Sequence, residues 1–193
     1  MNLDIERSYI GKVVAGIDEA GRGPLAGPVV AAAVIIGQGN IVAGIDDSKK
    51  LSQIKRESLY QHIIENHQYS VAVIQPQEID EINILQATIK ACILAERNLH
   101  VTPDIVLVDG NMKFSDPRFI SIVKGDAKSI SIAAASIIAK VTRDRLMEEL
   151  HHNYPMYNWY ANKGYGTKEH IDAIMRYGRT IHHRESFQFK IKG

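Results

Sequence analysis

The sequence predicts a single α/β domain in which helices flank a mixed β-sheet. Two observations support this prediction: short strand-like runs rich in valine and isoleucine come first, and later strand-like runs alternate with helical patterns. A length of 193 residues and a hydrophobic content of 45% suit one domain with an ordinary core. No internal repeat, low-complexity tract or linker-like break interrupts the sequence, so we expect one domain over residues 1–193, ending in a short tail.

The first half of the chain contains the strands of a predicted antiparallel meander. Short apolar runs rich in β-branched residues predict its strands at residues 13–17, 29–36 and 41–45. A further strand is expected at residues 69–74, where it ends at the sequence "QPQ".

Helical patterns lie on both sides of the strand expected at residues 69–74. Residues 52–67 are expected to form a helix with Ser52 as its N-cap, and its buried face is predicted to contain Ile54, Leu59, Ile63 and Ile64. A second helix is expected over residues 84–99. Cys92, the only cysteine, lies in its apolar stretch, so we expect a buried thiol and no intramolecular disulfide.

The second half alternates short strands with long helices. Residues 105–108 form a continuous apolar run that ends in Asp109 and Gly110, which is typical of a buried strand with an acid at its C-terminal tip. A second short strand is expected at residues 120–123, close to Asp126. Helices are predicted over residues 129–151 and 167–177, and the segment between them is predicted to be a loop.

Charge is distributed unevenly along the chain. The formal net charge is +1, but residues 1–123 carry a balance of −4 and residues 124–193 a balance of +5. A basic C-terminal third suits contact with a phosphate backbone, and ordinary solvated charge explains it equally well. The N-terminus lacks a hydrophobic signal core, and the longest apolar run is too short to span a bilayer. We therefore expect a cytoplasmic protein without a membrane segment and, at this size, a monomer.

The stretch "GIDEAGRGPLAGP" places two acids, Asp18 and Glu19, directly before a glycine-rich loop. Its glycines, Gly21, Gly23 and Gly27, are spaced one residue too far apart for a dinucleotide fingerprint, and no Lys-Ser or Lys-Thr follows as in a Walker loop. Carboxylates would also repel a pyrophosphate at the end of the strand. A nucleotide-cofactor site is therefore disfavoured.

Four acids are predicted to lie at the ends of strands or helices: Asp18, Glu19, Asp109 and Asp126. If they converge at one edge of the sheet, their mutual repulsion calls for a divalent cation. Oxygen ligands without paired cysteine or histidine favour Mg²⁺ or Mn²⁺ over zinc. Taken singly, Asp109 and Asp126 are also explained as turn formers or helix caps, so the argument depends on the four acids together.

These residues belong to long motifs that resemble those of the ribonuclease HII family, also called type 2 ribonuclease H. The matching motifs, in the family's order, are "GIDEAGRGPLAGPVVAAAVI", "DDSKKLS", "EIDEINILQAT", "LVDGN", "KGDAKSISIAAASIIAKVTRD", "GYGTKEH" and "HHRESF". The resemblance covers residues from about 13 to 187 and implies the ribonuclease H-like fold, a mixed five-stranded sheet flanked by helices. Ribonuclease HIII shares the "DEAG" core, but it typically carries an additional N-terminal domain, and "GRG" favours HII.

The resemblance implies an endoribonuclease that cleaves RNA in RNA/DNA duplexes and single ribonucleotides embedded in DNA. It would cut on the 5′ side of the ribonucleotide and leave 3′-hydroxyl and 5′-phosphate ends, as ribonucleotide excision repair requires. By motif, the four catalytic and metal-binding carboxylates would be Asp18, Glu19, Asp109 and Asp126. They would bind two Mg²⁺ or Mn²⁺ ions in a two-metal hydrolysis.

The resemblance also assigns substrate-binding residues. The backbone of Gly21, Arg22 and Gly23 would hydrogen-bond the ribose 2′-hydroxyl, and Tyr165 would pack against the neighbouring sugar. Without the resemblance, Tyr165 is equally well explained as a loop aromatic. Lys49, in "DDSKKLS", is a candidate phosphate contact or simply a charged residue before a helix.

Two further segments lie near the C-terminus. The motif formed by His183, Arg184, Ser186 and Phe187 matches the family, and we expect it to be a structural tie, without a mechanism that the sequence can assign. The tail "QFKIK" could act as a ligand for a sliding clamp, although a short basic tail explains it better. Two other function classes remain: a catalytically silent nucleic-acid-binding domain, which the four intact acids disfavour, and a small-molecule nucleotide enzyme, which the glycine spacing disfavours.

Overall fold

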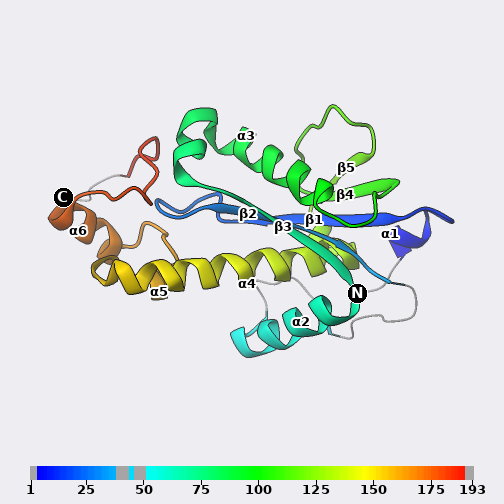
Figure 1. Ribbon diagram of the computed structural model, residues 1–193, viewed down its shortest axis with the longest axis horizontal. Coiled ribbons are helices and arrows are strands. Elements are labelled where there is room, and N and C mark those ends of the chain that lie inside the picture. The colour runs from blue at the N-terminus through cyan, green and yellow to red at the C-terminus, as the bar shows by residue number, and fades with distance from the viewer. Residues whose placement is uncertain (1–3, 38–43, 46–50, 190–193) are drawn as a thin grey trace.

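A five-stranded mixed sheet forms the centre of the protein, with helices on both faces. The structure is a computed structural model that describes residues 4–37, 44–45 and 51–189. The strand order is β3-β2-β1-β4-β5. Figure 1 shows α3 on one face of this sheet and α2 with α4 on the other. The predicted α/β class and the mixed five-stranded sheet are confirmed.

The sheet combines antiparallel and parallel pairing around its central strand. The strands are β1 (Val14–Ala20), β2 (Val29–Ile35), β3 (Gln68–Ile74), β4 (Ile105–Asp109) and β5 (Phe119–Ile122). β1 pairs antiparallel with β2 and parallel with β4, β2 pairs antiparallel with β3, and β4 pairs parallel with β5. β1 is therefore the strand at which the meander joins the parallel part of the sheet.

Three long helices cover the sheet, and shorter ones lie at its ends. The helices are α1 (Asp4–Arg7), α2 (Gln53–Asn66), α3 (Pro76–Arg97), α4 (Ile130–Asn153), α5 (Trp159–Asn162) and α6 (Lys168–Tyr177), with 3₁₀ turns at Gly125–Ala127 and Pro155–Tyr157. The hydroxyls of Ser52, Ser129 and Thr167 accept backbone N–H groups at the N-termini of α2, α4 and α6. The predicted Ser52 cap is thus confirmed.

The two faces of the sheet bury different hydrophobic clusters, because successive residues of a strand point to opposite sides. Ala31 and Ala33 of β2 pack in the cluster beneath α3, whereas Ala32 and Val34 pack in the cluster beneath α2 and α4. α4 packs closely against β1 because Gly16 leaves room for it. A Cβ atom at Gly16 would lie 2.2 Å from the backbone nitrogen of Ile132.

Several predicted boundaries need correction. α3 begins at Pro76, eight residues before the predicted start, and it contains a kink at Asn83, where φ is +66°. The side chain of Asn83 accepts backbone N–H groups of Leu85 and Gln86, so it acts as a second N-cap inside the merged helix. Ile54, predicted to be buried, is 84% exposed.

Some predictions fall partly or wholly outside the described residues. Of the predicted strand at 41–45, only Gly44 and Ile45 are described, and they do not form a strand. Cys92 is buried, as expected. In the part of the chain that the structure describes, no helix is both long and apolar enough to cross a bilayer. The expected single domain, monomeric state and cytoplasmic location stay predictions.

Candidate active site

The parallel pairing of β1 with β4 brings two of the predicted acids together. Ile17 pairs with Val108, so Asp18 and Asp109 are the next residues on neighbouring strands. β1 continues through Glu19 to Ala20, further than the predicted end at residue 17. We call Asp18, Glu19, Asp109 and Asp126 the acidic side of the site.

Charge interactions link three of the four acids. Burial raises the pKa of Asp18 well above its ordinary value, and the negative charges of Glu19 and Asp109 raise it further. A hydrogen bond from the backbone N–H of Glu19, 2.7 Å from Oδ1, and another from Ser136 only partly offset this effect. The protein therefore holds Asp18 where its negative charge is disfavoured, as expected of a cation ligand.

The turn that contains Asp126 is bonded to the tip of β4 through the backbone of the preceding residue. The N–H of Gly125 donates to Oδ1 of Asp109 at 2.7 Å, and this bond connects the tip of β4 to the 3₁₀ turn that contains Asp126. Asp126 is 8% exposed. A Cβ atom at Gly125 would lie 2.6 Å from Cδ1 of Ile132, so this turn packs closely against α4.

The donor chemistry of the acidic side fits a hard divalent cation, since it offers carboxylate oxygens whose repulsion a cation would relieve. The spacing is not fully preformed. Among the described residues, no three His, Cys, Asp or Glu side chains already surround a common point. Oε1 of Glu19 lies 3.4 Å from Nη1 of Arg22. Burial raises the pKa of the Cys92 thiol on α3, and the charge of Glu19 is the second largest cause of that rise.

A cleft of about 480 Å³ opens beside Asp18 and Glu19. Its lining comes from the end of β1, the glycine loop, α2, α4 and the loop before α6. The residues are Asp18, Glu19, Ala20, Gly21, Arg22, Gly23, Arg56, Ser136, Lys140, Arg143 and Tyr165. Acids at one end and several cations along the walls suit an anionic substrate that reaches the acids through bound cations.

The predicted recognition residues form the other side of this cleft, which we call the glycine side: the loop at residues 21–28 together with Tyr165. Gly21 has a φ of +95°, a conformation that favours glycine. A Cβ atom at Gly23 would lie 3.7 Å from Cε1 of Tyr165, so the ring of Tyr165 stands over Gly23. Arg22, Gly23 and Tyr165 are exposed, whereas Gly21 is buried.

Lys49 lies outside the described residues, so its predicted role is not addressed by the structure. Other cations do line the cleft. Nζ of Lys140 lies 2.6 Å from Oδ1 of Asp144, and Nη1 of Arg56 lies 4.0 Å from Oδ2 of the same residue. Both side chains could release Asp144 to contact a phosphate.

Two buried arginines behind the glycine side were not predicted to bear on the site. Arg143, 1% exposed, donates to the backbone carbonyls of Ala26, Pro28 and Lys163. Arg184, 0% exposed, donates to backbone carbonyls of the glycine loop. Sequence provides no local signal for these bonds, because the partners of Arg184 lie more than 150 residues away.

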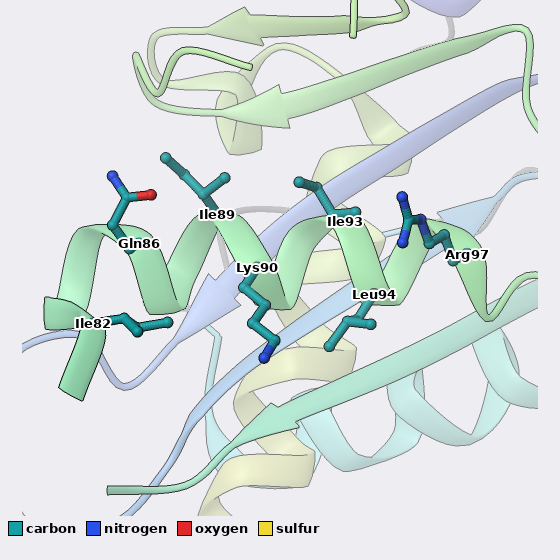
Figure 2. A pocket seen from close by; sticks show the side chains of 7 residues that line it. All are labelled: Ile82, Gln86, Ile89, Lys90, Ile93, Leu94 and Arg97. Carbon is teal, nitrogen blue, oxygen red and sulfur yellow. The ribbon is translucent and has the colours of Figure 1, made fainter. Parts of the chain in front are cut away.

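A second hollow of about 450 Å³ runs along α3, and it differs from the cleft in composition. Figure 2 shows its lining residues, all from α3: Ile82, Gln86, Ile89, Lys90, Ile93, Leu94 and Arg97. Lys90 forms an ion pair with Glu78. This lining contains no acid and no nucleophile, so the cleft between the acidic and glycine sides is the candidate active site.

Comparison with known proteins gives one consistent result. The family model described as Ribonuclease HII matches residues 15–190. A protein of Rickettsia akari named Ribonuclease HII is 64% identical over 186 residues, which cover 96% of each chain. Among solved structures, the ribonuclease H2 of Pyrococcus horikoshii OT3 is similar at 33% identity with a TM-score of 0.74, covering 91% of this chain and 93% of that one. The structure of the PCNA:RNase HII complex from Archaeoglobus fulgidus is similar at 27% identity with a TM-score of 0.77. The match covers 94% of this chain and 98% of that one.

Proposed function

This chain belongs to the ribonuclease HII family, and on that premise we propose that its cleft cleaves RNA in RNA/DNA duplexes and single ribonucleotides embedded in duplex DNA. As a type 2 ribonuclease H, the protein is an endoribonuclease and a metal-dependent phosphodiester hydrolase. The proposal adds the position of the cut, on the 5′ side of the ribonucleotide, and the products, a 3′-hydroxyl and a 5′-phosphate.

One observation carries this proposal: two acids on adjacent parallel strands interact electrostatically beside a glycine loop whose backbone faces the same cleft. The register of β1 and β4 aligns Asp18 with Asp109, and the charge of Asp109 helps to raise the pKa of Asp18. Gly21 and Gly23 line the cleft next to Asp18. A scissile phosphate at the acids would thus have its sugar near the loop.

The acidic side would bind the catalytic cations. We propose that Asp18, Glu19, Asp109 and Asp126 hold two Mg²⁺ or Mn²⁺ ions, since oxygen donors without cysteine or histidine suit hard ions. When bound, such ions supply an activated water and stabilise the charge that develops on the phosphoryl and leaving oxygens. The N–H of Gly125, the residue before Asp126, holds Oδ1 of Asp109 in place.

The glycine side would select ribose over deoxyribose. The backbone N–H groups of Arg22 and Gly23 can approach a 2′-hydroxyl closely, because Gly23 carries no side chain at the exposed surface. Tyr165 stands over Gly23 and would pack its ring against the adjacent sugar. Lys49 remains a proposed phosphate contact on the strength of its motif alone.

A duplex with a single ribonucleotide in one end-labelled DNA strand tests this function. We expect a nick on the 5′ side of the ribonucleotide with Mg²⁺ or Mn²⁺, no nick with chelator, and recovery when excess metal is added back. A polymerase should extend the product, because its end is a 3′-hydroxyl. A matched all-DNA duplex should stay intact. The proposal fails if neither ion supports cleavage, or if the all-DNA duplex is cut equally.

A sliding clamp is a second proposed partner, supported by the similarity to the Archaeoglobus fulgidus RNase HII in its complex with PCNA. The tail "QFKIK" would be the ligand, although residues 190–192 lie outside the described part of the chain. Phe189 packs against the hydrophobic cluster around Trp159, and Cζ of Arg179 lies 5.5 Å from the centre of its ring. Phe189 would have to leave this contact to bind a clamp. Co-elution with a bacterial clamp, lost in Phe189→Ala, would support the interaction, and no co-elution of the wild type would refute it.

A further inference from the structure

Two neighbouring buried side chains near the C-terminus, His183 and Arg184, reach the two parts of the glycine side separately. Both belong to the "HHRESF" segment, which follows α6. Figure 1 shows this segment, in red, beside the loop that joins β1 and β2. Neither residue lines the cleft. They can therefore affect a substrate only through the residues that they hold.

Arg184 holds the glycine loop through its carbonyl groups. Its Nη1 donates to the carbonyl of Arg22 at 2.9 Å, and Nη2 donates to the carbonyl of Gly21 at 2.5 Å. Nε and Nη2 both donate to the carbonyl of Gly27, at 3.0 and 2.8 Å. The guanidinium thus directs these hydrogen bonds to a single loop and holds both the start and the end of that loop.

Fixing these carbonyls also fixes the amides that face the cleft. In a trans peptide the C=O and the following N–H lie in one plane and point in opposite directions. The carbonyls of Gly21 and Arg22 point inward to Arg184, so the N–H groups of Arg22 and Gly23 point away from it. These are two of the groups that would read the 2′-hydroxyl.

The charge of Arg184 is maintained although the side chain is buried. Burial and the neighbouring charge of Arg143 lower its pKa to about 9, while Asp80 opposes the shift. A group with this pKa is still protonated near neutral pH. Transfer of a cation into the interior is costly unless hydrogen bonds compensate, and here backbone carbonyls supply them.

His183 reaches Tyr165 through a chain of hydrogen bonds whose direction follows from its partners. The N–H of Thr180 donates to Nδ1 of His183 at 2.9 Å, so a neutral His183 carries its proton on Nε2. That proton points to Nε2 of His170, 3.2 Å away, which also accepts from Trp159. His170 must then be protonated on Nδ1, which donates to the carbonyl of Tyr165 at 2.9 Å.

Further bonds connect the two loops with the "HHRESF" segment. The N–H of Arg184 donates to the carbonyl of Leu25, and the N–H of Leu25 donates to the carbonyl of Gly164, both at 2.8 Å. From the other side, Asp80 of α3 accepts the N–H groups of Glu185 and Ser186, at 2.8 and 3.0 Å. Residues 185–186 are thereby anchored to the N-terminal part of α3.

We propose that Arg184 and His183 are positioning residues that hold the glycine loop and Tyr165 at a fixed separation, and that selection of ribose depends on them. This inference rests on the proposed function, since it explains how that function's recognition groups are aimed. Arg184 would set the direction of the loop amides, and His183, through His170, would set the position of Tyr165.

The test measures ribose preference in a protein that does not cleave. In an Asp109→Asn background, the affinity for a duplex with one ribonucleotide is compared with the affinity for the matched all-DNA duplex, by fluorescence anisotropy with Mg²⁺. Adding Arg184→Lys keeps the charge but removes the planar fork of donors. We expect the ribose preference to fall about tenfold, which corresponds to about 1.4 kcal/mol. The affinity for the all-DNA duplex should stay within about threefold of the parent.

Arg118→Lys is the matched control, because Arg118 also bonds a backbone carbonyl and two acids but lies away from the cleft. It should lower the melting temperature without changing the ribose preference. If Arg184→Lys does not fold, Asp80→Ala is used as the test variant in its place. It removes the bonds that hold residues 185–186 and should lower the ribose preference about threefold, or about 0.7 kcal/mol.

The outcomes separate the inference from the proposed function. A parent protein without ribose preference contradicts the proposed recognition and this inference with it. A parent with clear preference that is unchanged in folded Arg184→Lys, or in Asp80→Ala where that variant decides, overturns the inference alone. A preference that falls equally in Arg118→Lys would show a general effect of stability and would also overturn it.

Discussion

The acidic side of the cleft is built mainly on strands, whereas the glycine side is built on loops. Asp18, Glu19 and Asp109 are part of β1 and β4, so the register of the sheet sets their positions. The loop at residues 21–28 depends on side-chain bonds from Arg143 and Arg184. The difference teaches that backbone pairing fixes the groups proposed for chemistry, whereas remote side chains fix the groups proposed for recognition. Changes far from the cleft should therefore alter recognition more readily than chemistry.

The largest expected effect follows a change on the acidic side. Asp109→Asn should lower the cleavage rate on the order of 10³-fold, because it removes a proposed metal ligand beside Asp18. Binding of the duplex should stay within about tenfold, or about 1.4 kcal/mol, since the substitution also removes a repulsive charge. Single-turnover cleavage and anisotropy measure the two quantities. Unchanged cleavage would remove Asp109 from the site.

Two glycine substitutions make a matched pair that sharpens the comparison. Gly16→Ala would place a Cβ atom 2.2 Å from the backbone of α4, and such overpacking should cost about 1–3 kcal/mol or more in the free energy of unfolding. Gly23→Ala should leave stability nearly unchanged, because its Cβ would make an ordinary 3.7 Å contact with Tyr165.

Urea denaturation measures the stability of both variants, and cleavage is then compared for those that fold. Gly23→Ala should still cleave more slowly, since the added methyl stands where the backbone would meet the sugar. Equal stabilities for the two variants would contradict the close packing of β1 against α4. Full activity of Gly23→Ala would contradict a close approach of substrate to this glycine.

A smaller effect is expected at Tyr165. Tyr165→Ala should slow cleavage at a single ribonucleotide about tenfold, within the about 1–3 kcal/mol range for loss of one aromatic stacking contact. Tyr165→Phe, which keeps the ring, should stay close to the wild type. The rates are compared on a single-ribonucleotide duplex and on a continuous RNA/DNA hybrid. An equal loss on both substrates would argue against a role of Tyr165 that is specific to a single embedded ribonucleotide.

A separate prediction concerns stability and not activity: the stability of the protein should depend on pH through His183. Burial lowers the pKa of His183 to about 4, and the nearby charges of His170, Arg179 and His182 act in the same direction. The unfolded state, with an ordinary pKa near 6.5, binds more protons between these values. The stabilisation is therefore complete above about pH 6.5 and is lost as the pH falls toward about 4.

Melting temperatures measured from pH 7.5 to pH 4.5 test this linkage. His183→Phe removes the titrating group, so its melting temperature should fall less over this range, relative to its own value at pH 7.5. Parallel curves for the two proteins would show that His183 does not titrate differently on folding.

Prediction from sequence succeeds where a short pattern determines the structure. The apolar run before Asp109 predicts β4 and its acidic tip, and Ser129 marks the start of α4. Prediction fails where distant contacts override a local pattern. Ile54 matches a buried helical position, yet it is 84% exposed. "QPQ" marks the end of β3 as predicted, but α3 already begins at Pro76, eight residues before its predicted start.

The candidate site shows the same division. The acids and the glycine loop could be recognised because their residues are close in sequence or follow strands. Arg184 could not, because an arginine in a short polar segment ordinarily predicts an exposed side chain. Its burial depends on carbonyls of Gly21, Arg22 and Gly27, which only the folded chain brings within reach.

The central claim is that chemistry and ribose recognition depend on separately supported sides of one cleft. One experiment tests it most directly. The cleavage rate and the ribose preference in binding are measured on the same preparations of wild type, Asp109→Asn and Arg184→Lys. For the binding measurement, Arg184→Lys is also combined with Asp109→Asn. We predict that Asp109→Asn loses cleavage and keeps the preference, whereas Arg184→Lys loses the preference and retains metal-dependent cleavage at a reduced rate. If both variants lose both properties in the same proportion, the two sides are not separate and the account is wrong.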